Sequence, residues 1–101
     1  MTPEKRLMNE IRIEAGKRNC VVIRLNVGKF MKIDGTYFDT GIPTGFPDLM
    51  VLTDDGRTIF IETKIHPRKP SKQQKEMISL LKSKGHNAHV IYDITEFLNV
   101  L

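Results

Sequence analysis

The sequence contains one cysteine and no long apolar run, and each scarcity excludes a class of protein. The single Cys20 permits no internal disulfide and supplies no zinc-binding cluster, so we interpret it as a small core residue. No apolar run approaches the roughly 18 residues that a membrane helix needs, and residues 1–6 lack the apolar stretch of a signal peptide. We therefore expect a cytoplasmic protein that does not contact a membrane.

What the sequence does contain is the composition of one globular domain, residues 1–101, with a modest basic excess. Sixteen Lys and Arg residues against twelve Asp and Glu residues give a formal net charge of +4. Part of this excess is concentrated in one short segment, which holds Lys64, His66, Arg68, Lys69, Lys72 and Lys75. Such a cluster favours a polyanionic partner such as nucleic acid. Few aromatic residues lie among these cations, so we expect contacts to phosphates more than stacking on bases.

Hydrophobic periodicity and turn residues predict an α/β protein. We expect helices over residues 3–18, 71–84 and 94–101, and strands over residues 20–25, 48–53, 58–64 and 88–92. Residues 26–47 are expected to be mostly loop, with a short hairpin around Asp34 and Gly35. In the helix over residues 71–84, we expect the inward side chains to be Met77, Ile78, Leu80 and Leu81. A hairpin followed by a strand–helix–strand crossover implies a mixed sheet with helices against its faces.

Two carboxylates lie where this hairpin should bury apolar side chains. If residues 54–56 form a three-residue loop, Thr53 pairs with Arg57, and the same register places Asp48 opposite Glu62. Opposed like charges destabilise a strand pair, and a divalent cation would compensate for them. Oxygen ligands of this kind suit Mg²⁺ or Mn²⁺ better than zinc. Lys64 shares the face of Glu62 and would position the attacking water or stabilise charge on a phosphate.

A hairpin at the protein surface would explain the same residues without any chemistry. Taken alone, such a carboxylate pair is more often structural than catalytic. The neighbouring apolar runs, residues 49–52 and 59–61, are instead typical of central strands buried on both faces. A carboxylate at the end of a buried strand favours the metal site.

The same residues resemble a known nuclease signature. Gly45-Phe46-Pro47-Asp48 followed by Glu62-Thr63-Lys64 is similar to the P-D…(D/E)-x-K motif of the restriction-endonuclease-like nucleases, and specifically to the virus-type replication-repair nuclease (VRR-NUC) domain. The resemblance extends over residues 9–92, through residues 9–12, 24–28 and 71–74. It implies an αβββαβ core, in which helices flank a central mixed four-stranded sheet.

The resemblance also implies an activity, a metal-dependent phosphodiesterase acting on DNA, and roles for individual residues. The metal ligands would be Asp48, Glu62, the main-chain carbonyl of Thr63 and, from the first helix, Glu10. Glu14 lies on the same face of that helix and remains an alternative to Glu10. Lys64 would be the catalytic lysine, and Gln74 would contact substrate or water. The predicted DNA-binding residues are Arg24, His66, Arg68, Lys69, Lys72 and Lys75. The sequence departs from the family pattern at Leu25 and Lys72, where asparagine and proline are common.

We therefore expect an Mg²⁺-dependent DNA endonuclease in which Mn²⁺ can substitute. A non-catalytic DNA-binding module on the same fold is the alternative from another class. The compact, phage-encoded members of the family suggest cleavage of four-way junctions by a homodimer, in the host cytoplasm, rather than nicking or flap cleavage by a monomer. The predicted self-association surface is the apolar part of the loop over residues 26–44, which holds Phe30, Met31, Ile33, Tyr37, Phe38 and Ile42.

Overall fold

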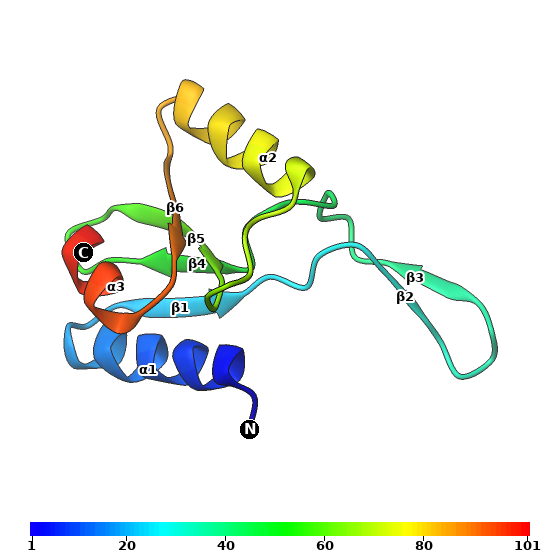
Figure 1. Ribbon diagram of the computed structural model, residues 1–101, viewed down its shortest axis with the longest axis horizontal. Helices are drawn as coiled ribbons and strands as arrows, with labels where there is room; N and C mark the ends of the chain where they lie inside the picture. The colour runs from blue at the N-terminus through cyan, green and yellow to red at the C-terminus, as the bar shows by residue number, and fades with distance from the viewer.

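A computed structural model describes residues 1–101 as a four-stranded sheet with helices on both faces and a separate two-stranded arm (Figure 1). The elements in chain order are α1 (Pro3–Lys17), β1 (Val21–Arg24), β2 (Lys29–Met31), β3 (Tyr37–Asp39), β4 (Leu49–Leu52), β5 (Thr58–Thr63), α2 (Lys72–Ser83), β6 (Asn87–Ile91) and α3 (Ile94–Val100). None of the three helices is long and apolar enough to cross a membrane.

The large sheet has the order β1-β4-β5-β6. β4 pairs antiparallel with both β1 and β5, whereas β6 runs parallel to β5 after the crossover through α2. This is a mixed sheet, because a hairpin connects β4 to β5 and a helix connects β5 to β6. The predicted fold class, an α/β protein with a four-stranded mixed sheet and flanking helices, is confirmed.

Short polar residues fix where the helices begin. The Thr2 hydroxyl accepts a hydrogen bond from the Lys5 main-chain N–H at 3.2 Å, and Pro3 opens α1. At the start of α2, Ser71 and Gln74 form a reciprocal capping box. Gly85 follows α2 with φ +88°, the left-handed conformation that ends many helices and favours glycine. Ser71 and Gly85 therefore delimit α2, close to the predicted range of residues 71–84.

Two apolar clusters hold the helices to the sheet. The larger cluster joins α1 and α3 to one face, and its fully buried members include Ile11, Leu49, Val51, Ile59, Ile61 and Phe97. The smaller cluster joins α2 to the other face through Ile78, Leu81 and Ala88, with Phe46 and Phe60 packed against it.

The second face is only partly covered, which corrects two expectations. Leu80, predicted to point inward, is 48% exposed. Leu52 is 36% exposed, so β4 is buried on one face and not on both, and Val21, which pairs with Leu52 from β1, is 56% exposed. The reason is the position of α2, which packs over β5 and β6 and leaves β1 and the end of β4 open.

Strands β2 and β3 form an arm, residues 29–39, that projects from the body of the protein (Figure 1). Its turn is closed by Asp34, whose side chain accepts hydrogen bonds from the main-chain N–H and the hydroxyl of Thr36. Gly35 follows Asp34 with φ +87°. The predicted hairpin around Asp34 and Gly35 is confirmed. All six residues in the two strands are exposed, so the arm contributes nothing to the core.

Candidate active site

Asp48 and Glu62 meet at one end of the β4–β5 hairpin. Leu49 pairs with Ile61 in the observed register, and one further step places Asp48 opposite Glu62. At the turn, the Thr53 N–H donates to the Arg57 carbonyl at 2.9 Å, which confirms the predicted register. The carboxylate of Asp48 is held in place, because the Thr63 N–H donates to Oδ1 at 3.2 Å and the Thr63 hydroxyl donates to Oδ2 at 2.7 Å.

Glu62 is the more unusual of the two carboxylates. It is only 4% exposed, and no hydrogen bond offsets its burial. Burial raises the pKa of Glu62 to about 8, the charges of Asp48 and Glu4 add to the rise, and only Lys64 opposes it. The pKa of Asp48 is also raised by burial, against the two hydrogen bonds from Thr63. The pair is therefore poorly compensated within the protein, and a cation between the carboxylates would stabilise it.

A third carboxylate comes from the first turn of α1, and it is Glu4. Its Oε1 atom lies 3.4 Å from the Thr63 hydroxyl oxygen, and its charge raises the pKa of both Asp48 and Glu62. Sequence reasoning missed this residue. A signal was available: Glu4 lies three and four residues before the buried Leu7 and Met8, so it belongs to the helix face that packs on the sheet.

The structure does not bring Glu10 or Glu14 to this cluster. Glu10 is six residues beyond Glu4, roughly 9 Å further along the helix axis, and it lines a different pocket beside Tyr92. Glu14 forms ion pairs with Arg18 at 2.7 Å and with Lys17 at 3.3 Å. The sequence offered Glu10 and Glu14 as the helical carboxylate of the site. Neither side chain faces Asp48 and Glu62, so the expected pair of candidates did not include the residue that does.

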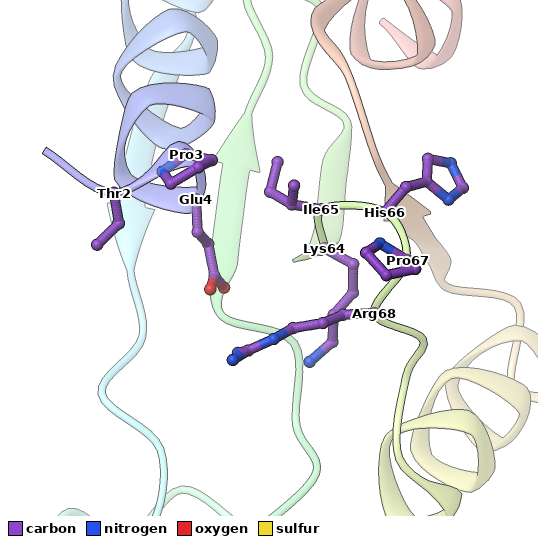
Figure 2. A pocket seen from close by; sticks show the side chains of 8 residues that line it. All are labelled: Thr2, Pro3, Glu4, Lys64, Ile65, His66, Pro67 and Arg68. Atoms are coloured by element: carbon purple, nitrogen blue, oxygen red, sulfur yellow. The ribbon is translucent and has the colours of Figure 1, made fainter.

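A pocket of about 350 Å³, which we call the Arg68 pocket, opens between the first turn of α1, with Glu4, and the segment over residues 64–68 (Figure 2). The charged ends of Glu4, Lys64 and Arg68 turn towards one space in this view, whereas the His66 ring points away from it. His66 instead stacks on Tyr92, with ring centroids 4.1 Å apart and an interplanar angle of 11°. Lys64 and Arg68 thus supply the positive charge next to the carboxylates.

The other predicted site residues occupy different surroundings. The Gln74 side-chain carbonyl accepts the Ser71 N–H at 2.8 Å, so this end of the amide caps α2. Arg24 lines a second pocket, which also contains Glu4 and Asp48. The remaining predicted DNA-binding residues are all exposed: Lys69, Lys72 and Lys75. They are available to a polyanion outside the pocket.

The carboxylate cluster has the chemistry of a hard-cation site, although no three His, Cys, Asp or Glu side chains lie close enough to hold a metal by themselves. Two carboxylates, Asp48 and Glu62, supply oxygen donors. Glu4 stands near enough to change the pKa of both. A small number of oxygen ligands, completed by water, would suit Mg²⁺ or Mn²⁺ better than zinc.

Gly45 positions the loop that delivers Asp48. It has φ +89°, and a Cβ atom there would lie 2.8 Å from the main-chain oxygen of Gln73 in α2. The backbone of the Gly45–Asp48 segment thus touches the start of α2, which connects this loop to the helix that follows the site.

We expect Gly45→Ala to destabilise the fold by more than about 2 kcal/mol, because it combines a left-handed φ with a backbone clash. Gly28→Ala is the matched control, since Gly28 has φ +90° and a Cβ atom added there would meet no other atom within 4 Å. It should cost only about 1 kcal/mol. Thermal melts of the two variants measure the difference. Equal losses would mean that the contact with Gln73 contributes nothing.

Comparisons with known proteins agree with this architecture. The VRR-NUC domain family model matches residues 3–92. A solved structure described as a VRR_NUC domain is 22% identical in sequence, with a TM-score of 0.73. The match covers 95% of this chain and 90% of the other. No protein with curated annotation matches the sequence. The structural likeness shows a shared fold, and the family model spans most of the chain.

Proposed function

The chain belongs to the VRR-NUC family, which has a nuclease-type fold for processing DNA, and we propose that it is an Mg²⁺-dependent DNA endonuclease. The observation that supports this proposal best is the buried pair of Asp48 and Glu62, opposed across two strands beside Lys64. A structural role would favour neutral or apolar side chains at these positions, because burying two like charges is costly. The pair is consistent with a site that a cation completes.

The residues of the site would have separate roles in metal binding and in phosphodiester hydrolysis. Asp48, Glu62 and the Thr63 carbonyl would hold Mg²⁺, and Glu4 would contribute through a water molecule. The bound cation would lower the pKa of a water molecule and offset charge on the scissile phosphate. Thr63 orients the Asp48 carboxylate through its two hydrogen bonds. Lys64 holds positive charge beside the pair and would position the attacking water or stabilise the phosphate.

Arg68 completes the positive wall of the pocket. Its side chain ends near that of Lys64 (Figure 2), so it would bind a phosphate next to the one that is cleaved. The exposed Lys69, Lys72 and Lys75 would bind phosphates further along the DNA. Arg24 and His66 remain proposed DNA-binding residues. Arg24 would contact DNA from the pocket that it shares with Glu4 and Asp48, and His66 would contact DNA at the outer edge of the Arg68 pocket.

A non-catalytic DNA-binding module is the alternative. Such a module would be expected to lack one of Asp48, Glu62 and Lys64, and the sequence keeps all three. The test is cleavage of labelled duplex, flap, splayed-arm and four-way-junction DNA in Mg²⁺, Mn²⁺ or EDTA. Cleavage with either metal and none in EDTA supports the nuclease. DNA binding without cleavage under every condition would leave only the binding module.

The helical carboxylate offers a sharp test within this proposal. Glu4→Gln should lower the cleavage rate by about 10- to 100-fold, the range typical of groups that support metal ligands. Glu10→Gln is the matched control, because it makes the same change in the same helix away from the carboxylate pair. Its rate should remain near that of the unmodified protein. If single-turnover assays showed a large loss of rate for Glu10→Gln and little loss for Glu4→Gln, Glu10 and not Glu4 would be the helical carboxylate of the site.

We also propose that the protein acts on branched DNA as a homodimer. Each chain carries one candidate site, and resolving a four-way junction takes two symmetric incisions. The arm supplies a surface for the second copy: its large apolar side chains beyond Phe30 are 53% to 109% exposed, namely Met31, Ile33, Tyr37 and Phe38. Lys29, Lys32, Asp34 and Asp39 give residues 29–39 no net charge, which favours a protein contact over DNA. An isolated two-stranded hairpin is also marginally stable unless it packs against something.

Light scattering tests the assembly. We expect a dimer at micromolar concentration and a shift towards monomer for Ile33→Asp, which places a charge at the most exposed apolar residue of the arm. Ile33→Asp changes the turn end of the arm and leaves Phe30, at the base of the arm, as it is in the unmodified protein. A monomer with and without junction DNA that nicks one strand would contradict the junction proposal and favour the monomeric nicking or flap nuclease.

A further inference from the structure

A second pocket borders the carboxylates on the side away from Arg68, and we call it the Phe30 pocket. It encloses about 290 Å³, and Glu4 and Asp48 form part of its lining. Thr2 and Glu4 line both pockets, so the two hollows flank the N-terminal turn of α1. The Phe30 pocket therefore shares Glu4 and Asp48 with the candidate metal site, and the rest of its lining comes from other residues.

The two pockets differ in chemistry. The Arg68 pocket is lined mainly by charged and polar groups, with Ile65 as an apolar exception, and it suits the sugar–phosphate backbone. The Phe30 pocket adds an aromatic ring and the apolar side chains of Met8, Leu25 and Val27 to its polar groups. A pocket with an apolar wall and a few polar groups is suited to an organic ring more than to a phosphate alone.

We infer that the Phe30 pocket binds one unpaired nucleotide next to the scissile phosphate. Phe30 is half exposed and lines the pocket, so its ring is available for stacking on a nucleobase. Asn26 offers an amide that can both donate to and accept from a base edge. This inference rests on the proposed function, because it specifies the DNA structure that the same site would prefer.

The charged residues around the pocket determine where the phosphate of a bound nucleotide would lie. Lys5 and Arg24 supply cations, whereas Glu4 and Asp48 are carboxylates on the side of the candidate metal. A nucleotide with its phosphate against Lys5 and Arg24 and its base against Phe30 avoids repulsion from the two carboxylates. Its neighbouring phosphate would then extend over Asp48 towards the Arg68 pocket. The two pockets would thus bind one strand on either side of the cleaved bond.

The need for an unpaired base follows from size and energetics. About 290 Å³ suits a single nucleotide and not a base pair. A base within a duplex must leave its stack and its partner to enter, at a cost of a few kcal/mol. A nucleotide at a junction, flap or single-stranded end is already unpaired and avoids this cost. The pocket would therefore select open DNA structures over paired ones.

The test measures binding without cleavage. A short single-stranded oligonucleotide that carries 2-aminopurine is titrated with the full-length protein in EDTA, and its fluorescence reports stacking. We expect quenching with the unmodified protein and roughly tenfold or greater loss of affinity for Phe30→Ala, the usual effect of losing one stacked base. Phe30→Trp should restore both affinity and quenching. A duplex that carries the same 2-aminopurine in a base pair should show little quenching.

Phe38→Ala is the matched control. Phe38 is directly opposite Phe30 in the arm and is similarly exposed, but it does not line the pocket. Each substitution therefore removes the same cross-strand pair, and only Phe30→Ala alters the pocket. Affinity of Phe38→Ala within about twofold of the unmodified protein supports the inference. Equal losses in both variants would assign the effect to the folding of the arm or to its contact with a second copy, and the inference would be overturned.

The result is separable from the nuclease proposal. Binding of 2-aminopurine that depends on Phe30, in a protein that cleaves no DNA in Mg²⁺ or Mn²⁺, would leave the nucleotide pocket and refute the nuclease. Metal-dependent cleavage together with unchanged binding for Phe30→Ala would leave the nuclease and refute the pocket.

Discussion

Glu62→Gln is expected to abolish metal-dependent cleavage while making the metal-free protein more stable at alkaline pH. Loss of a metal ligand removes several kcal/mol of transition-state stabilisation, which corresponds to roughly a thousandfold loss in rate. The gain in stability has the opposite origin, because glutamine removes the charge that Glu62 acquires in a buried position next to Asp48 and Glu4. If the charge of Glu62 stabilised the fold, Glu62→Gln would instead lower the stability of the metal-free protein.

The sign of the pH dependence follows from the pKa of Glu62. This pKa is about 8 in the folded protein against 4.5 for an ordinary glutamate, so the folded state holds a proton that the unfolded state releases between these values. The metal-free protein therefore loses stability as the pH rises from about 4.5 to about 8. Glutamine has no such proton, so Glu62→Gln should equal the unmodified protein near pH 4.5 and exceed it at pH 8.5.

Thermal melts in EDTA across this pH range check the expectation. Glu76→Gln is a suitable control, because Glu76 is exposed and contacts only Lys72, at 4.0 Å. Its stability should differ little from that of the unmodified protein at either pH. A Glu62→Gln protein that melts below the unmodified protein at pH 8.5 would mean that Glu62 stabilises the fold, and the metal-site interpretation would fail with it.

The sequence was sufficient to predict the geometry around the two carboxylates because the information is local. The Asp54–Gly56 turn sets the register, and the register alone places Asp48 opposite Glu62. Similarly, Ser71 and Gly85 delimit α2 through short-range hydrogen bonds and one left-handed residue. Each of these features depends on residues within a few positions of one another, so the periodicity and turn rules apply directly.

The spacing of Glu4 before Leu7 and Met8 indicates its helix face, but it does not single out Glu4 among the carboxylates of α1. Which helical carboxylate faces the hairpin depends on how α1 lies across the sheet, and that is decided by packing between Leu7, Ile11 and residues far along the chain, such as Leu49. The same limitation explains the exposure of Leu80, since no local pattern reports that α2 stops short of β1. Both the helical carboxylate that reaches the site and the exposure of Leu80 are decided by packing between residues far apart in the sequence, and not by local helix propensity.

Lys64→Ala is expected to lower the single-turnover cleavage rate by at least about a hundredfold while leaving DNA affinity nearly unchanged. Removal of one group that stabilises charge in a transition state typically costs roughly 10²- to 10³-fold in rate. Lys64 is suited to this role because it lies two residues beyond Glu62, opposes the rise in the pKa of Glu62, and turns towards the same space as Glu4 and Arg68 (Figure 2).

Arg68→Ala is the informative comparison, since it removes a neighbouring cation from the same pocket. We assign Arg68 to phosphate binding, so its loss should weaken the binding of every DNA structure and reduce the slope of log affinity against log salt concentration by nearly one. Lys64→Ala should leave that slope unchanged, because its charge acts mainly on the reacting phosphate. The two variants therefore separate rate from affinity. If both lowered affinity equally and neither slowed the bound complex, Lys64 would be a binding residue, and the chemistry would have to come from the carboxylate cluster alone.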